Sequence, residues 1–166
     1  MIRPARPDDV PTILALIQDL AEYERARHEA RATPEQLRRA LFGDSPSVFA
    51  HLAEHPGPGG SEVAGFALWF LNFSTWTGRH GIYLEDLYVR PELRGHGYGA
   101  ALLVELARVC VRQGYTRLQW SVLDWNQPAI DFYRRLDAKP LDEWTVYRLE
   151  GEALERAANG GSHPLE

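Results

Sequence analysis

Three glycines alternate with other residues where an apolar run ends and a helical pattern begins. Gly95, Gly97 and Gly99 follow the apolar run 82–89 and precede the run 100–113, whose apolar residues recur at helical spacing. Without side chains at alternate positions, successive backbone N–H groups can approach an anion. The N-terminus of the following helix adds roughly half a positive charge. The segment therefore predicts a strand, a tight turn and a helix that together hold a phosphate group.

The spacing of these glycines separates the turn from two better-known phosphate loops. A nucleotide-triphosphate loop ends in Gly-Lys-Ser/Thr, and a dinucleotide fingerprint spaces its glycines G-x-G-x-x-G. Here they run G-x-G-x-G, and Arg94, directly before them, adds a charged donor. A flexible turn without a ligand is the alternative, and the strand before it and the helix after it favour the phosphate site.

The order of apolar patterns predicts an α/β (α+β) domain with one central mixed sheet and helices on both faces. Residues 1–150 are expected to form that domain, and 151–166 a polar, flexible tail. Strands are expected at 2–5, 47–53, 62–73, 82–89, 118–123 and 145–149. Helices are expected from residue 8 or 9 to about 25, and at 33–41, 100–113 and 126–136. A turn is expected at 55–61 and a loop at 74–81.

Composition excludes several classes of function. The net charge is -5, with 18 basic and 23 acidic residues, which argues against non-specific binding of nucleic acid. The lone Cys110 excludes an internal disulfide framework, and the six histidines show no metal-ligand spacing, so no metal site is expected. No apolar run approaches the length of a membrane span, and the N-terminus lacks the apolar core of a signal peptide. We therefore expect a cytoplasmic protein.

Arg94-Gly95-His96-Gly97-Tyr98-Gly99 resembles the R/Q-x-x-G-x-G/A signature of the GCN5-related N-acetyltransferases (GNAT). Within that superfamily the chain is most similar to diamine (spermidine/spermine) and thialysine N-acetyltransferases. The resemblance runs from about residue 2 to residue 158 and rests also on segments 2–5, 20–24, 63–67, 83–89 and 125–133. It implies a twisted, mostly antiparallel mixed sheet of about six to seven strands. That sheet would be splayed between its fourth and fifth strands.

The resemblance also implies acetyl-CoA as the co-substrate. Its pyrophosphate would lie on backbone amides of the glycine turn, and its pantetheine arm would pair with the strand before that turn like an added strand. A backbone N–H of that strand would stabilise the oxyanion of the thioester carbonyl. The cofactor-binding residues would be Leu87, Tyr88, Val89, Arg94, Gly95, His96, Gly97, Tyr98, Gly99, Ala100, Asn126 and Tyr133.

Transfer to an amine requires one group that takes a proton and one that gives a proton. A primary amine has a pKa near 10, so at neutral pH it is almost wholly protonated and has no free electron pair. By resemblance, Glu85 is the candidate base, directly or through water, and Tyr133 is the candidate acid for the thiolate. Because successive strand residues face opposite sides, Glu85 and Asp86 are expected to have different roles. Both acids could instead be solvated at a strand end, and Tyr133 could be a core aromatic.

The amine site is expected to be lined by residues that could hold a cation. By resemblance these are Tyr23, Glu24, Trp76, Glu85 and Asp86, although Glu24 could equally belong to a solvated helix face. Carboxylates suit the second ammonium of a polyamine, a diamine or a thialysine-like substrate. The loop before Glu85 is one residue longer than in the relatives, which leaves the substrate open there. Relatives pair as homodimers, often through C-terminal strands, so residues 145–149 are expected to offer such an edge.

One residue departs from the pattern of the relatives. Asp137 stands where they carry a glycine, and aspartate adopts the left-handed conformation at modest cost. Two alternatives to a diamine or thialysine-like acceptor remain open. One is acetylation of an amino acid or an antibiotic amine, and the other is a non-catalytic acyl-CoA sensor on the same fold. A sensor needs only the glycine turn, whereas this chain also carries Glu85 and Tyr133.

Overall fold

The computed structural model describes residues 1–160, which belong to two compact units. The first spans Met1–Ser121 and the second begins at Val122. The first holds the sheet, three of the α-helices and the glycine turn.

The first unit is built on a five-stranded sheet in the order β1-β2-β3-β4-β5. Its strands are β1 (Ile2–Pro4), β2 (Phe49–Gly57), β3 (Gly60–Ser74), β4 (Arg79–Val89) and β5 (Leu118–Gln119). Neighbours pair antiparallel except β4 and β5, which are parallel. The mixed, mostly antiparallel sheet is confirmed, with fewer strands than the six to seven expected.

The number of strands is lower than expected because the described part of the chain after α3 contributes only two residues to the sheet. The strand expected at 118–123 is reduced to Leu118–Gln119, and residues 145–149 form no strand. A strand needs a neighbour for its backbone groups, and Val146 and Tyr147 are 84% and 91% exposed. The strands β2, β3 and β4 are instead longer than expected. The turn expected at 55–61 is mostly strand, because β2 and β3 continue to a short connection.

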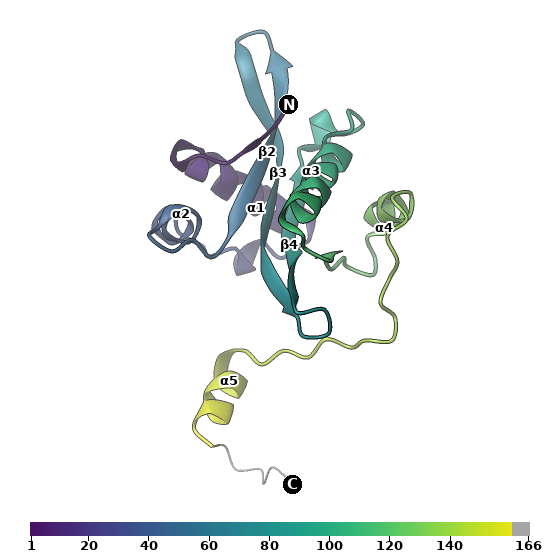
Figure 1. Ribbon diagram of the computed structural model, residues 1–166. Helices are drawn as coiled ribbons and strands as arrows, with labels where there is room; N and C mark the ends of the chain where they lie inside the picture. The colour runs from purple at the N-terminus through teal and green to yellow at the C-terminus, as the bar shows by residue number, and fades with distance from the viewer. Residues whose placement is uncertain (161–166) are drawn as a thin grey trace. The chain divides into compact units, whose positions relative to one another are not determined.

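Helices cover both faces of the sheet, as expected (Figure 1). α1 (Val10–Tyr23) and α2 (Pro34–Phe42) lie on one face, and α3 (Tyr98–Gln113) lies on the other. The core under α1 and α2 joins the helices to β2, β3 and β4 through fully buried side chains, among them Ile13, Leu16, Leu52 and Phe66. Each such side chain contributes roughly 1.5–3 kcal/mol by leaving water. This packing fixes α1 against the β4 residues that form the candidate site.

The residues that precede α2 and α1 differ in whether their side chains cap the helix. Thr33 caps α2, because its hydroxyl accepts from the Gln36 N–H and the Gln36 side chain accepts from the Thr33 N–H. Asp9 precedes α1, but its carboxylate accepts from Arg3 and from the Arg6 N–H rather than from the helix. α1 ends at Tyr23, two residues before the expected end.

The second unit contains α4 (Gln127–Arg134) and α5 (Gly151–Ala158). α4 begins after Asn126, whose side-chain oxygen accepts from the Ala129 N–H at 3.4 Å and so caps the helix. Asp137 has φ +58°, the left-handed conformation expected where the relatives carry glycine. Within the expected polar, flexible tail, residues 151–158 form α5, and residues 161–166 lie outside the described residues.

Candidate functional site

The glycine turn connects β4 to α3 through one short 3-10 turn, η3 (Pro91–Leu93). Gly95 and Gly97 have φ +82° and +80°, values that side chains disfavour, and Gly97 caps α3. Among residues 1–160, no acceptor bonds the backbone N–H groups of 95–100; the first N–H with a partner belongs to Ala101. A row of unpaired donors at a helix N-terminus fits a pyrophosphate group.

His96 of the turn packs against Tyr98, the first residue of α3. The His96 ring stacks on Tyr98 at 6.0 Å, and its Nδ1 donates to the carbonyls of Leu93 and Arg94 at 3.2 and 3.1 Å. The Tyr98 hydroxyl lies 2.7 Å from the His55 Nδ1 at the end of the β2–β3 hairpin. The hairpin therefore holds the turn in place from outside the strand–turn–helix segment.

Arg94 points toward α1 rather than along the turn. Its Nε donates to the Val89 carbonyl at 3.0 Å. The guanidinium carbon lies 5.0 Å from the Tyr23 ring centre and 5.7 Å from that of Tyr88. Cation–π contacts of this kind contribute about 0.5–1 kcal/mol each at exposed sites. Arg94 thereby links the end of α1 to the end of β4.

The C-terminal half of β4 has one edge without a strand in the first unit. Pairing with β5 is confined to Ile82 and Tyr83, whereas Leu87, Tyr88 and Val89 pair with β3 alone. The splay expected between the fourth and fifth strands is thus present. An extended ligand could add to such an edge through backbone hydrogen bonds.

A β-bulge in β4 determines where its two acids lie. Leu68 pairs with Asp86 and Trp69 with Leu84, so Glu85 is an extra residue in β4. The strict alternation expected for this strand is interrupted there. Asp86 shares with Tyr88 the face covered by α1, and Glu85 is exposed.

Three carboxylates interact at this bulge. Burial, together with the negative charges of Glu85 and Glu24, raises the pKa of Asp86 to about 7. Burial also raises the pKa of Glu24, which follows the last residue of α1. Because the charges of Glu85 and Glu24 act on Asp86, the three predicted acids lie within electrostatic reach of one another. A carboxyl with a pKa near neutrality can accept a proton at physiological pH.

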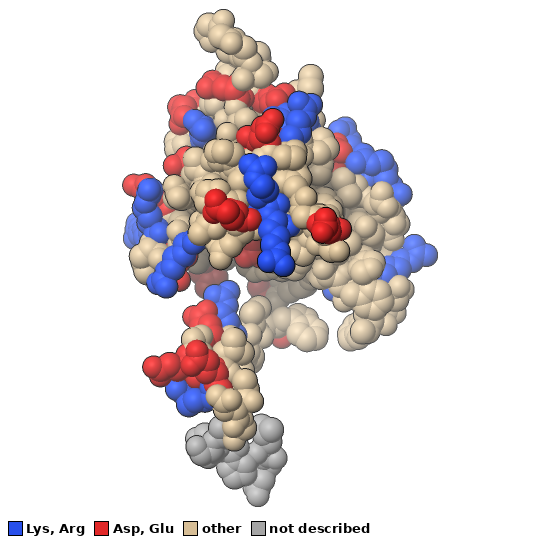
Figure 2. All heavy atoms as spheres, turned by 90° about the vertical axis from the view of Figure 1, so that its left-hand side faces the viewer, with Lys and Arg blue, Asp and Glu red and all other residues tan. Residues whose placement is uncertain are grey.

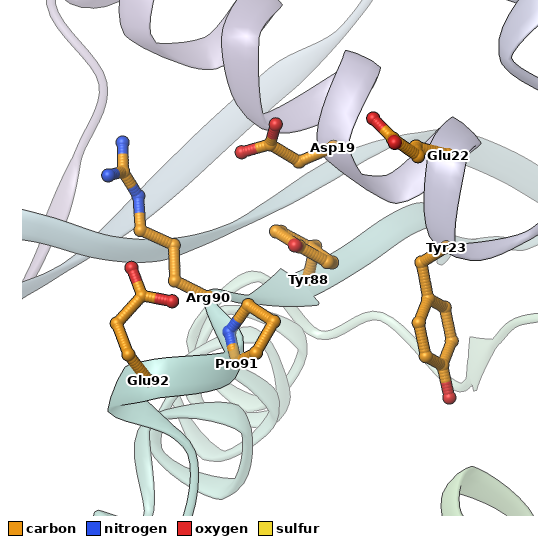
Figure 3. A pocket seen from close by; sticks show the side chains of 7 residues that line it. All are labelled: Asp19, Glu22, Tyr23, Tyr88, Arg90, Pro91 and Glu92. Carbon is orange, nitrogen blue, oxygen red and sulfur yellow. The ribbon is translucent and has the colours of Figure 1, made fainter.

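A cavity of about 390 Å³ opens beside this cluster, between α1 and the end of β4 (Figure 3). It contains two predicted site residues, Tyr23 and Tyr88. The sequence did not single out its other lining residues, although the polar face of the first helix was a signal for two of them. These residues are Asp19, Glu22, Arg90, Pro91 and Glu92.

The remaining predicted site residues lie apart from this group or in the second unit. Trp76 is 90% exposed in the β3–β4 connection. Asn126 caps α4 in the second unit, and Tyr133 lies in α4 with its ring 5.3 Å from that of Phe132. The first unit thus brings together Tyr23, Glu24, Glu85, Asp86 and Tyr88.

Charge on the face that carries α1 and α2 is mixed: Figure 2 shows acidic and basic side chains interspersed on it. The carboxylates at the bulge are thus a local feature of β4 and α1. Within residues 1–160, no three metal-ligating side chains gather into a possible metal site. No helix in the same range has the length and apolar character needed to cross a membrane.

A sequence model of the acetyltransferase (GNAT) family matches residues 13–138. The chain is 42% identical over 165 residues to a thialysine N-epsilon-acetyltransferase of Bos taurus, covering 95% of this chain and 96% of the relative. It is 33% identical to an L-ornithine N5-acetyltransferase of Arabidopsis thaliana, covering 93% of this chain and 86% of that protein.

Solved structures agree with the sequence comparisons. An integron cassette protein from the mobile metagenome of V. cholerae superposes with a TM-score of 0.77 at 25% identity, covering 95% of this chain and 96% of that one. An aminoglycoside acetyltransferase from a soil metagenome has the same fold, with a TM-score of 0.74 at 17% identity over 90% of this chain and 96% of its own.

Proposed function

The chain belongs to the acetyltransferase (GNAT) family, and from that premise we propose that it transfers an acetyl group from acetyl-CoA directly to a primary amine of a small cationic substrate. That it is an N-acetyltransferase follows from relatives about 40% identical over nearly the whole chain. The observation that carries the proposal is the arrangement on β4. Unpaired N–H donors suited to a pyrophosphate follow the strand, and carboxylates suited to an ammonium lie on it.

Acetyl-CoA would be held by backbone groups in two places. The N–H groups of residues 95–100 would receive the pyrophosphate, with His96, Tyr98 and Ala100 around it. The open edge of β4 at Leu87, Tyr88 and Val89 would receive the pantetheine arm. One N–H of that edge would stabilise the charge that develops on the thioester oxygen. Arg94 would act from the α1 side, where its guanidinium lies between two tyrosines.

The reaction requires the ammonium to lose a proton before its nitrogen attacks. That nitrogen then bonds the acetyl carbon, the bond from this carbon to sulfur breaks, and the thiolate takes up a proton. Glu85 is the base proposed by resemblance. Asp86 is a second candidate, favoured by its pKa of about 7 and its place on the α1 face. Tyr133 is the proposed proton donor, since a phenol near pKa 10 is matched to a thiol near 8.5.

The second unit would complete the site and the assembly. We propose that Asn126 and Tyr133 bind the CoA arm, and that residues 1–150 act as one catalytic domain. The family match supports this, because residues 13–138 span the boundary between the two units. A homodimer through residues 145–149 is supported by the exposure of Trp144, Val146 and Tyr147. A cytoplasmic location stays a prediction from the sequence.

A panel of amines tests the function. Purified protein with acetyl-CoA is expected to release thiol with spermidine, putrescine, thialysine or lysine, and not with an aminoglycoside. The Tyr133→Phe variant is expected to lose about 100-fold or more in turnover. Tight binding of CoA with no acetylation of any amine would support the acyl-CoA sensor instead. Undiminished turnover of Tyr133→Phe would remove Tyr133 from the acid role.

A further inference from the structure

The unpaired N–H groups of the glycine turn need support from outside the turn. A Cβ at Gly95 or Gly97 would meet no atom of the described residues within 4 Å, so open space surrounds both positions. Glycine also loses more conformational freedom on folding than any other residue. A turn that holds backbone donors in fixed positions for an anion therefore depends on contacts made by the side chains beside these glycines.

His55 supplies such contacts from β2, 43 residues before Tyr98 in the sequence. Its Nδ1 forms a hydrogen bond of 2.7 Å with the Tyr98 hydroxyl, and its ring meets the Tyr98 ring edge to face at 5.9 Å. The same ring meets that of His96 edge to face, with 5.5 Å between the two centres. One imidazole thus contacts both ring-bearing side chains of residues 95–100.

Both partners of His55 are joined to the backbone that carries the donors. The His96 Nδ1 donates to the carbonyls of Leu93 and Arg94, at the start of the turn. The His96 ring stacks on Tyr98, the first residue of α3. The backbone N–H of Tyr98 is itself one of the donors without an acceptor among the described residues. A displacement of His55 would therefore change the positions of the turn and of the first residue of α3.

The strand that carries His55 is anchored independently of the turn. β2 pairs with β3 along its whole length, with His55 opposite Glu62. The preceding residue, Glu54, accepts from the Arg3 Nε at 2.6 Å, and its carbonyl accepts from the Met1 amine at 2.8 Å. His55 is thus held in place by contacts that do not involve the turn. Binding costs less when the donors of a site are already ordered before the ligand arrives.

We propose that His55 is a positioning residue for acetyl-CoA, which acts through Tyr98 and His96 to hold the unpaired N–H groups of the turn where they bind the pyrophosphate. The proposal rests on the proposed acetyl transfer and adds the β2–β3 hairpin to the cofactor site. Its consequence is selective, because His55 acts on the turn and not on the amine. Loss of the His55 contact would weaken ligands that carry the pyrophosphate and leave other ligands unchanged.

Two acyl donors test this selectivity: acetyl-CoA, and S-acetylpantetheine, which has the same thioester arm without phosphates. His55→Phe keeps a ring and removes the hydrogen bond, and it is expected to lower kcat/KM for acetyl-CoA by about 10-fold, mainly through KM. The kcat/KM for S-acetylpantetheine and the KM for the amine are expected to change by less than about 2-fold. His55→Asn is expected to recover most of the loss, because its amide oxygen, like Nδ1, is bonded to Cγ and can pair with the Tyr98 hydroxyl.

Three further variants serve as controls. His80→Phe is matched to His55→Phe, because the His80 Nδ1 bonds the Asn72 carbonyl at 3.2 Å beside the β3–β4 connection. It is expected to leave kcat/KM for both acyl donors unchanged. Tyr98→Phe is expected to match His55→Phe, and the double variant is expected to lose no more than either, since both remove one shared contact. Retained activity with S-acetylpantetheine would show that each variant is folded.

Binding of CoA, measured by calorimetry, separates failure of this proposal from failure of the proposed function. An affinity that falls about 10-fold in His55→Phe, without acetylation of any amine by the wild type, would overturn only the acetyl transfer. Equal loss with both acyl donors, unchanged CoA affinity in His55→Phe, or additive losses in the double variant would overturn the positioning role alone. A wild-type protein that binds no CoA would overturn both.

Discussion

The glycine turn and the carboxylates of β4 lie a few residues apart, yet they arise from the sequence in different ways. The turn depends on its own residues, because Gly95 and Gly97 permit the left-handed backbone that leaves the N–H groups unpaired. The carboxylates depend on a bulge at Glu85 and on α1 packed above Asp86. Unpaired backbone donors can therefore be inferred from the local sequence, whereas side chains with a shifted pKa can be identified only from the tertiary structure.

The largest expected effect concerns the carboxylates. Asp86→Asn is expected to lower kcat/KM by about 10²- to 10⁴-fold, the range for loss of a general base. In wild-type protein kcat/KM is expected to rise with pH through about 7, because Asp86 must lose its proton before it can accept one from the amine. Kinetics of the wild-type protein and of Asp86→Asn between pH 5 and 9 provide the measurement.

Glu85→Gln is the matched comparison, since it removes a neighbouring charge at an exposed position. Loss of that charge is expected to move the rising limb of the pH profile to lower pH, because Glu85 helps to raise the pKa of Asp86. If Glu85→Gln is instead the inactive variant and Asp86→Asn keeps the rising limb, Glu85 is the base. The resemblance to the family, and not the burial of Asp86, would then identify the base correctly.

A smaller effect is expected of Asp86→Asn on the free energy of unfolding, and the burial of Asp86 determines its direction. The folded-state pKa of Asp86 is raised to about 7 from the ordinary 3.8, so the folded state binds the proton more tightly than the unfolded chain. This group's contribution is therefore fully present below pH 4 and declines as pH rises to about 7. Asp86→Asn removes the decline and is expected to be more stable at pH 8 by up to about 4 kcal/mol.

Chemical denaturation at pH 4 and pH 8 measures this difference. Asp44→Asn, an exposed aspartate after α2, is the control for loss of one negative charge. Equal stability of wild type and Asp86→Asn at both pH values would show that Asp86 is solvated in the folded protein. The carboxylates of β4 would then not depend on tertiary structure in the way that distinguishes them from the glycine turn.

Much of the fold follows from local patterns. The order of the expected strands and helices predicted the layers and most of the sheet. Residues 145–149 were predicted as a strand, but a local segment cannot supply the neighbouring strand that its backbone needs. In their own unit they remain without one, and Tyr147 is 91% exposed.

The candidate site was predictable to the extent that its residues act through the backbone or through a motif. Glu24, Glu85 and Asp86 were predicted together, and the structure brings their charges within reach. Two features were not predictable from the sequence. The bulge depends on the pairing of β3 with β4, and the cavity containing Arg90 depends on how α1 crosses that strand.

The smallest effect is expected for substitutions in the glycine turn, where two variants distinguish the effect of charge on CoA binding from the effect of backbone strain. Asparagine and aspartate both adopt positive φ at modest cost, and a Cβ at Gly97 would meet no atom within 4 Å. Gly97→Asn and Gly97→Asp are therefore matched in shape and differ in charge. Gly97→Asp is expected to weaken CoA binding by about 30-fold relative to Gly97→Asn, because a carboxylate would face the pyrophosphate across partly screened space.

Calorimetric titration with CoA measures both variants, and Gly59→Asp in the β2–β3 connection is the control for an added charge elsewhere. The penalty for Gly97→Asp is expected to shrink as salt is added, because screening weakens the repulsion between exposed charges. Equal affinities for Gly97→Asn and Gly97→Asp would mean that the anion lies away from the unpaired N–H groups. The turn would then be a flexible connection, and the carboxylates of β4 alone would mark the site.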